Sequence, residues 1–254
     1  MTPDEAGECP RSDVSARGTG LNLRAVHAAG VPPNRVFRSG DPTTVGPAEA
    51  AELAGRHGLR TALDLRSDPE VDQGGPPSAL LAAGVRWVRT PVFGYPRETV
   101  HQPRPTTDAY VRYYRGIAEH SAPGCLPAVF AAAAQAADEP FLVSCSAGKD
   151  RTGVVIASLL DLAGTPDTDI VTDYAASTAG LGPHSDRFAA KWTRHGWTRE
   201  EYLTHLVARP DTIRSWLAET RRTYGSVRGA LLARGVGADD LTRLTDLLRK
   251  ESMC

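Results

Sequence analysis

The sequence of 254 residues has little lysine and no surplus of charge of either sign. Lysine occurs only at positions 149, 191 and 250, so arginine carries nearly all of the positive charge, and the formal net charge is −1. No block of basic residues interrupts this balance. Because nucleic-acid binding needs such a basic patch, we expect no nucleic acid among the partners.

Cysteine is scarce as well, with four residues at positions 9, 125, 145 and 254. Their spacing is too irregular for a disulfide framework or a zinc site, and the seven histidines show no metal-ligand spacing either. We therefore expect a protein that uses no metal ion and no cofactor.

Long apolar runs are also missing. Met1 to Arg17 is polar and acidic, which predicts a disordered tail and not a signal peptide. Without an apolar stretch of membrane-spanning length, we expect no stable membrane insertion and a cytoplasmic location. A chain of this length with 41% hydrophobic residues can bury one substantial core, which predicts a single domain over residues 18–254. The oligomeric state stays open.

What the sequence does contain is one stretch, Ser144 to Gly153, in which reactive and anion-binding residues are concentrated. Pro140 to Val143 predicts a buried strand before it, and Val154 to Leu162 predicts a buried helix after it. A tight loop from strand to helix directs backbone N–H groups and the positive helix end at an anion. At such a place the pKa of a cysteine falls from about 8.5 to between about 3.5 and 7.5. Cys145 is thus a candidate nucleophile.

Other interpretations of this loop agree less well with its residues. A nucleotide-binding P-loop needs glycine where Val143 stands and serine or threonine where Asp150 stands. A redox pair needs a second cysteine two residues from Cys145, and there is none. An isolated cysteine would most simply be a buried structural residue. Gly148 and Arg151 at these offsets favour catalysis instead, since arginine offers a planar fork that grips two phosphate oxygens.

A cysteine, five residues, and an arginine followed by Thr152-Gly153 resemble the signature of the cysteine-dependent protein tyrosine phosphatase superfamily. The fuller string from Cys145 to Gly153 is similar to the bacterial branch of secreted mycobacterial tyrosine phosphatases, which act on phosphotyrosine, phosphoserine and phosphoinositides. The resemblance covers roughly residues 20 to 250, with further matching segments at 22–24, 35–39, 64–66, 173–174 and 224–226.

The order of secondary-structure signals agrees with this resemblance. Strand signals are confined to the first 145 residues, at 36–37, 59–65, 85–92 and 140–143. Helix signals occur at 47–56, 106–118, 127–137, 167–177, 211–224 and 238–249. We predict an α/β fold, a phosphotyrosine-phosphatase-like central sheet flanked by helices, with a largely helical C-terminal half. The polar, proline-rich residues from Gly94 onward predict a lid-like segment around 94–120.

The resemblance implies a metal-independent reaction. Cys145 attacks phosphorus and forms a phosphocysteine, which water then hydrolyses. Arg151 and the loop amides bind the phosphoryl oxygens where charge gathers. Thr152 is in addition a candidate donor to the Cys145 sulfur. The candidate substrate-binding residues are Ser146, Ala147, Gly148, Lys149, Thr152 and Gly153.

Two positions depart from the pattern of the superfamily. Ser144 stands where a histidine usually precedes the cysteine, and the aspartate expected as general acid after Val92 is missing. Asp150 is then the best candidate for the acid that protonates the leaving oxygen, with Glu98 and Asp108 as alternatives.

Three further residues are candidates for support of the loop. We expect Asp64 and Arg66 to brace it from a neighbouring strand end, and Ser144 to contribute from the catalytic strand itself.

These features predict a cysteine-dependent phosphomonoesterase. The resemblance implies a tyrosine or dual-specificity phosphatase whose partner is a phosphorylated protein or phosphoinositide. The departures from the pattern keep open a phosphatase of a small metabolite, such as a sugar or nucleoside phosphate in a bacterial pathway. A non-catalytic phosphate-binding module is the third alternative, and the complete pair of Cys145 and Arg151 argues against it.

Overall fold

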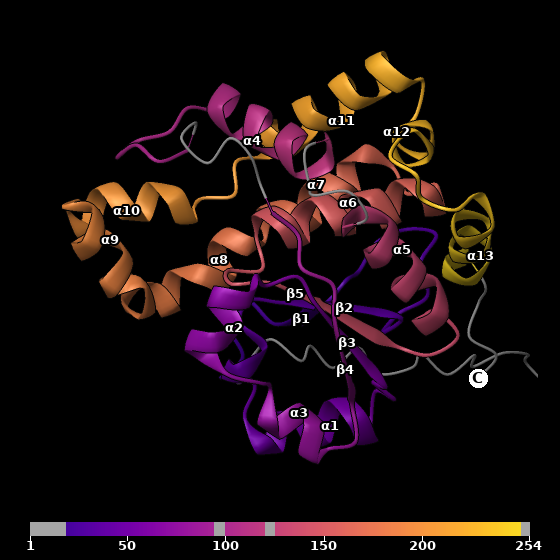
Figure 1. Ribbon diagram of the computed structural model, residues 1–254, viewed down its shortest axis with the longest axis horizontal. Helices are drawn as coiled ribbons and strands as arrows, with labels where there is room; N and C mark the ends of the chain where they lie inside the picture. The colour runs from indigo at the N-terminus through magenta and orange to yellow at the C-terminus, as the bar shows by residue number, and fades with distance from the viewer. Residues whose placement is uncertain (1–18, 94–99, 120–124, 250–254) are drawn as a thin grey trace, which may run out of the picture.

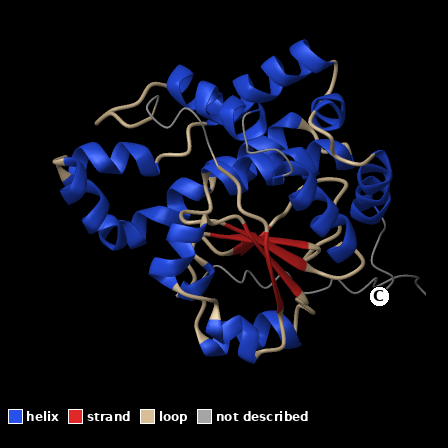
Figure 2. Cartoon of the chain, in the orientation of Figure 1, coloured by secondary structure: helices blue, strands red, loops and turns tan. Residues whose placement is uncertain are grey.

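One five-stranded sheet forms the centre of the protein, for which a computed structural model describes residues 19–93, 100–119 and 125–249 (Figures 1 and 2). The strand order is β1-β2-β5-β3-β4; β1 is antiparallel to β2, and the other pairings are parallel. The strands are β1 (Arg24–Ala25), β2 (Val36–Ser39), β3 (Thr61–Asp64), β4 (Arg86–Arg89) and β5 (Phe141–Ser144). The predicted tail, residues 94–99 of the predicted lid, and with them Glu98, lie outside the described residues.

Strand β5 lies between β2 and β3, and all four of its residues are buried. The apolar character of its first three residues, Phe141 to Val143, follows from this position, because a parallel strand in the middle of a sheet is covered on both faces. Leu142 packs on one side with Phe37 and helices α1 (Pro47–Gly55) and α3 (Ser78–Ala82). Val143 packs on the other side with α5 (Cys125–Ala136) and α6 (Asp150–Ala163).

Most of the remaining helices gather on the α6 side of the sheet, as Figure 1 shows. Helix α6 is buried along nearly its whole length and ends at Gly164, whose φ of +81° gives the left-handed cap that glycine favours. The other helices of this half are α4 (Thr107–Glu119), α7 (Asp167–Ala175), α11 (Pro210–Tyr224), α12 (Val227–Ala233) and α13 (Ala238–Arg249). The prediction of an α/β fold with a helical C-terminal half is therefore confirmed.

A group of short helices projects from the sheet and its covering helices at the left side of Figure 1. It consists of α8 (Ser177–Leu181), the 3₁₀ turn Gly182–Phe188, α9 (Ala189–His195) and α10 (Arg199–Leu206). We call residues 177–206 the side helices. They have a small core of their own, in which Phe188 and Tyr202 pack against Leu21. This group brings residues far along the chain to the edge of the sheet at which β5 ends.

Several elements were not expected from the sequence. The short strand β1 extends the sheet at its edge, helix α2 (Asp68–Gly74) follows β3, and the short helices α8 and α9 lie in the C-terminal half. The predicted helix 167–177 ends at Ala175, and α8 begins two residues later. None of the helices among the described residues has the length and apolar character needed to cross a membrane.

Candidate active site

The predicted loop connects β5 to α6, so the strand–loop–helix prediction is confirmed. Cys145 follows the strand directly and is 2% exposed, and its Sγ accepts a hydrogen bond from the backbone N–H of Gly148 at 3.2 Å. Gly148 has a φ of +67°, and a Cβ there would lie 2.4 Å from the backbone of Ser39. Only glycine therefore allows the loop to close around the sulfur.

The carbonyl groups of the loop are held by other parts of the chain. Asn22 donates through Nδ2 to the carbonyl oxygens of Ala147 at 3.2 Å and of Gly148 at 3.0 Å. Arg38 donates to the same Gly148 oxygen at 2.7 Å, and the N–H of Asp41 donates to the Ser146 oxygen at 3.1 Å. Because these acceptors are occupied, the loop can present its N–H groups to an anion.

Arg38 is in turn fixed by an ion pair. Its guanidinium is fully buried and contacts the carboxylate of Asp173. A buried arginine needs such a partner, since an unpaired buried charge is strongly destabilising. The segments 22–24, 35–39 and 173–174, which matched the family pattern, thus meet behind the loop and support it.

Arg151 is held by a carboxylate that the sequence did not point to. Its Nη1 and Nη2 donate to Oε2 and Oε1 of Glu70, each at 2.7 Å, and Nη1 also donates to the carbonyl of Leu65 at 3.2 Å. Glu70 is fixed by its own helix, because it accepts bonds from the N–H and hydroxyl of Ser67 at 2.8 and 2.9 Å. Nε of Arg151 bonds to none of the described residues. Nε and the second proton of Nη2 remain for a phosphate.

This pair fixes the charge of both partners. Burial works to raise the pKa of Glu70, but the hydrogen bonds and charge of Arg151 outweigh it and hold the pKa at about 2. Burial works to lower the pKa of Arg151, and the negative charges of Cys145 and Glu70 reverse this and raise it. Glu70 is therefore an ionised carboxylate at neutral pH and cannot serve as the proton donor.

Asp150 is the other carboxyl group that lines the pocket with Cys145 and Arg151. Its Oδ1 accepts a hydrogen bond from the hydroxyl of Tyr114 at 2.7 Å, and that hydroxyl lies 2.7 Å from the hydroxyl of Tyr174. Burial and the charge of Asp150 raise the pKa of Tyr114, which keeps it protonated as the donor. Oδ2 of Asp150 bonds to nothing in the described chain. It remains for a leaving group.

The alternative acids are placed differently. Asp108 lies in the exposed first turn of α4 and is not part of the pocket lining, while Glu98 is outside the described residues. Asp150 thus stays the best candidate among the carboxyl groups whose position is known.

The structure also places the remaining predicted residues. Ser144 is buried, and its hydroxyl donates to the carbonyl of Leu63 on β3 at 3.2 Å. The hydroxyl of Thr152 is buried without a hydrogen-bond partner among the described residues. The predicted bond from Thr152 to the Cys145 sulfur is therefore not formed, and the donor to this sulfur is the N–H of Gly148.

Asp64 and Arg66 lie beside the loop without touching it directly. Asp64 is opposite Ser144 in the sheet, and Arg66 donates to its Oδ2 at 2.8 Å. Arg66 also donates to Oδ1 of Asp41 at 2.8 Å, and Asp41 is the residue that holds the Ser146 carbonyl. This chain of contacts supports the loop through one intermediate residue.

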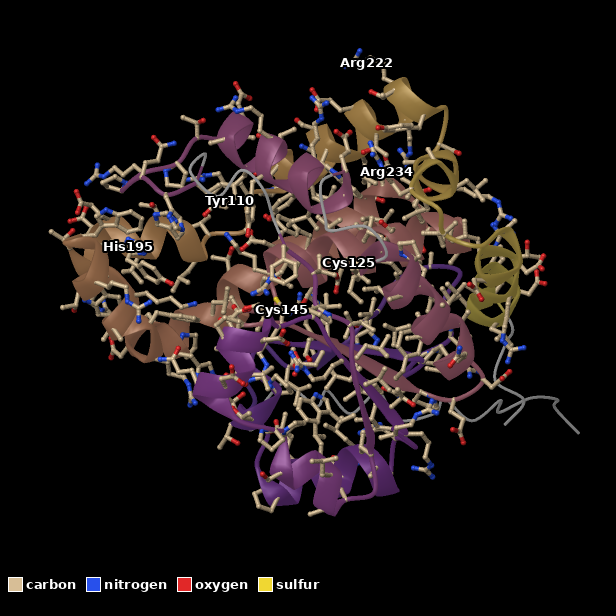
Figure 3. All side chains as sticks on the ribbon, viewed as in Figure 1. Tyr110, Cys125, Cys145, His195, Arg222 and Arg234 are labelled. Carbon is tan, nitrogen blue, oxygen red and sulfur yellow. The ribbon has the colours of Figure 1, made fainter. Side chains whose placement is uncertain are left out.

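The pocket above Cys145 has a volume of about 210 Å³ and is shared between the body and the side helices. In Figure 3, Cys145 lies near the centre of the molecule, with Tyr110 above it and His195 farther out on the left. The lining consists of Glu70, Val100, His101, Tyr110, Tyr113, Cys145, Ser146, Ala147, Lys149, Asp150, Arg151, Lys191, His195, Trp197, Tyr202, His205 and Leu206. Of the predicted substrate-binding residues, Ser146, Ala147 and Lys149 belong to this lining, and Gly148 lies between them.

A column of stacked rings forms the side-helix wall of this pocket. Trp197 lies between His195 and His205, with ring centroids 4.6 and 4.8 Å apart. Burial and the nearby charge of Lys149 lower the pKa of His205 to about 4, so its ring is neutral at pH 7. The wall is thus aromatic and mostly uncharged beside a loop built for an anion.

Sequence reasoning missed Glu70, Tyr114 and Lys191 as site residues. A signal existed for Glu70, because Ser67 with Glu70 three residues later and Pro69 between them is a capping box after a strand end. No local signal marked Tyr114 or Lys191, whose roles depend on contacts with distant segments.

Comparison with known proteins agrees with this geometry. The model of the tyrosine phosphatase family matches residues 17–250. A tyrosine-protein phosphatase of Nostoc commune is 30% identical over 258 residues, which cover 96% of this chain and 81% of the relative. The triple specificity protein phosphatase PtpB of Mycobacterium tuberculosis is 29% identical over 259 residues, covering 87% of this chain and 93% of that protein.

Among solved structures, the core catalytic domain of the PP-IP phosphatase SIW14 from S. cerevisiae, in complex with citrate, shares 16% identity. The match covers 79% of this chain and 93% of that chain with a TM-score of 0.33, a likeness too distant to carry an argument. The family model, by contrast, spans nearly the whole chain, and this protein belongs to the tyrosine phosphatase family and is a cysteine-dependent phosphatase.

Proposed function

We propose that the protein hydrolyses phosphomonoesters through a phosphocysteine intermediate on Cys145, with substrates of the tyrosine or dual-specificity type. The observation that carries this proposal is the shared pocket. Cys145, Arg151 and Asp150 belong to one lining. Nucleophile, phosphoryl-binding group and acid are the three components that a two-step displacement needs.

The first step is an in-line attack of the Cys145 thiolate on phosphorus. The sulfur–phosphorus bond forms while the bond from phosphorus to the leaving oxygen breaks, and Asp150 gives its proton to that oxygen. Arg151 and the loop N–H groups stabilise the charge on the three equatorial oxygens. Since Glu70 fixes the guanidinium by two bonds of 2.7 Å, little reorganisation is needed when the phosphoryl group arrives.

The second step releases phosphate. A water molecule attacks the phosphocysteine, the carboxylate of Asp150 accepts one of its protons, and the sulfur leaves as a thiolate. The N–H of Gly148, 3.2 Å from Sγ, is placed to stabilise the negative charge that returns to the sulfur. The same aspartate therefore alternates between acid and base.

The pocket lining supports an aryl phosphate as substrate. Tyr110, Tyr113, Trp197 and Tyr202 contribute aromatic surface to the cavity, which suits the flat ring of a phosphotyrosine. A small phosphorylated metabolite is the second candidate function, supported by the cationic residues Lys149 and Lys191 at the same cavity.

The test is to trap the intermediate. The full-length protein is mixed with an aryl phosphate, quenched with acid during turnover, and digested for mass spectrometry. We expect a phosphoryl group on the peptide that contains Cys145 and none after Cys145→Ser, which abolishes turnover while vanadate still binds. Turnover with the phosphoryl group on another residue, or turnover by the serine variant, would overturn the mechanism. A panel of phosphopeptides, sugar phosphates and nucleoside phosphates then ranks the two substrate classes by kcat/KM.

A further inference from the structure

Two of the three lysines in the chain, Lys149 and Lys191, line the pocket, and their surroundings differ. Lys149 is 2% exposed, and its Nζ donates to the carbonyl of His205. The same nitrogen lies 3.4 Å from the Val207 carbonyl, 3.4 Å from Oδ1 of Asp150 and 4.3 Å from the centre of the Tyr110 ring. An ammonium group has three protons to donate, and protein groups take them here.

Lys191 is exposed, and it reaches the loop from α9. Its Nζ donates to the hydroxyl of Ser146 at 3.1 Å and lies 5.2 Å from the centre of the Phe188 ring. No carboxylate of the described residues comes within 4 Å of it. Lys191 therefore has one neutral acceptor and two protons left, directly beside the residue that follows Cys145.

Of the three cations that line the pocket, Lys191 is the one for which no carboxylate partner is found among the described residues. Arg151 is paired with Glu70 at 2.7 Å, and Lys149 faces Asp150 at 3.4 Å. The scissile phosphate already has the loop N–H groups and the free edge of Arg151 as partners. The positive charge of Lys191, held beside the Ser146 hydroxyl at 3.1 Å, is thus available for a different anionic group of the same ligand.

We propose that Lys191 binds a second phosphate of the substrate, so that the preferred substrates are phosphomonoesters with another phosphate next to the scissile one. This inference rests on the proposed function, because it concerns the same reaction at Cys145. Lys191 is then a specificity residue supplied by the side helices, and Lys149 serves to tie the loop to α10 and to Tyr110.

The test compares matched substrates on the full-length protein. Soluble inositol phosphates with one phosphate, or with two on neighbouring ring carbons, are hydrolysed by the wild type, by Lys191→Gln and by Lys191→Arg. We expect the wild type to favour the bisphosphate in kcat/KM. Lys191→Gln should reduce this preference by about tenfold, mostly through KM, and Lys191→Arg should restore part of it, because a charge-assisted contact is worth about this factor.

Arg194→Gln is the matched control, because Arg194 lies exposed on the same helix and is not part of the pocket lining. The substitution removes one positive charge, as Lys191→Gln does. It should keep the wild-type preference. Vesicles that display the same bisphosphate on a lipid distinguish a lipid headgroup from a free metabolite. A kcat/KM that is higher on vesicles than on the soluble bisphosphate assigns the substrate to the membrane.

Three outcomes would overturn the inference. Equal losses of kcat/KM on both substrates in Lys191→Gln would mean that Lys191 serves the scissile phosphate. A loss confined to phosphotyrosine peptides with acidic neighbours would assign Lys191 to a protein substrate. A wild type that is active on aryl phosphates but shows no preference for the bisphosphate would reject the second subsite while leaving the proposed function intact. A wild type inactive on every phosphomonoester would reject the proposed function itself.

Discussion

The substitution Glu70→Gln tests whether the guanidinium of Arg151 acts as a fixed group. Glu70 accepts from both terminal nitrogens of Arg151 at 2.7 Å and is itself held by Ser67. Glutamine has nearly the same volume, but one carboxylate oxygen becomes an NH₂ group. Because two donors then face each other, at most one of the two bonds to Arg151 can form, and it loses its charge assistance.

The magnitude follows from the pKa of Glu70, which the site lowers from 4.5 to about 2. At 1.36 kcal/mol per unit, this shift corresponds to about 3 kcal/mol of net preference for the ionised form. We expect Glu70→Gln to lower the free energy of unfolding by roughly 1–3 kcal/mol, since one neutral bond survives. If the transition state loses the same amount of stabilisation, kcat/KM falls by about 10- to 100-fold.

The assay measures kcat and KM on an aryl phosphate, the Kd of vanadate, and thermal unfolding for the same preparations. Glu139→Gln removes one charge from an exposed site away from the pocket, and we expect it to match the wild type. Since Arg151 contacts the transferring group, the loss should appear in kcat and in vanadate affinity as well as in stability. A Glu70→Gln variant with reduced stability but wild-type kcat would show that the pair is only structural and refute the reasoning.

Four further outcomes are expected. The stability difference between wild type and Glu70→Gln should be fully present above about pH 4.5 and disappear as the pH falls through about 2, because a lowered carboxylate pKa stabilises the fold only while the group is ionised. Chemical denaturation at several pH values measures this difference. A difference that persists at the lowest pH would contradict the expectation. Arg151→Lys should cost most of kcat although it keeps the charge, since lysine cannot bind Glu70 and phosphate with a planar fork; near-normal turnover would place the arginine elsewhere. Asp150→Asn should impair alkyl phosphates far more than activated aryl phosphates and flatten the basic limb of the alkyl pH–rate profile, whereas equal losses on both would leave Asp150 a structural role. Activity should survive EDTA and be lost to mild peroxide with recovery by thiol, while a requirement for added Mg²⁺ or Zn²⁺ would exclude the phosphocysteine route.

The catalytic loop could be predicted from the sequence because its chemistry is local. Strand, cysteine, glycine, arginine and helix follow one another within about 25 residues, so hydrophobic pattern and residue spacing were enough to place the nucleophile and the arginine at one helix end. The α/β class was likewise predictable, because buried parallel strands need continuous apolar runs, and the strand signals lie within the first 145 residues while helix signals dominate afterwards.

The departures show where local reasoning fails. Ser144 and the missing acid after Val92 were visible in the sequence, and Asp150 could be named as a candidate acid, but the contacts that hold Ser144 and Asp150 were not. The hydroxyl of Ser144 bonds to the neighbouring strand β3, and the candidate acid Asp150 is held by a tyrosine from α4. A spacing rule can state that a residue type is absent, and only the packed structure shows what the residues present at these positions contact.

The sequence by itself thus determined the fold class, the loop and the identity of its cysteine and arginine, since these depend on periodicity and on neighbours along the chain. The tertiary structure alone decided how the loop is held and what faces it. Glu70 is 81 residues from Arg151, Tyr114 is 36 from Asp150, Asn22 is 126 from Gly148, and Lys191 is 45 from Ser146. Contacts over such separations arise from the packing of whole elements, so no local pattern of residues contains them.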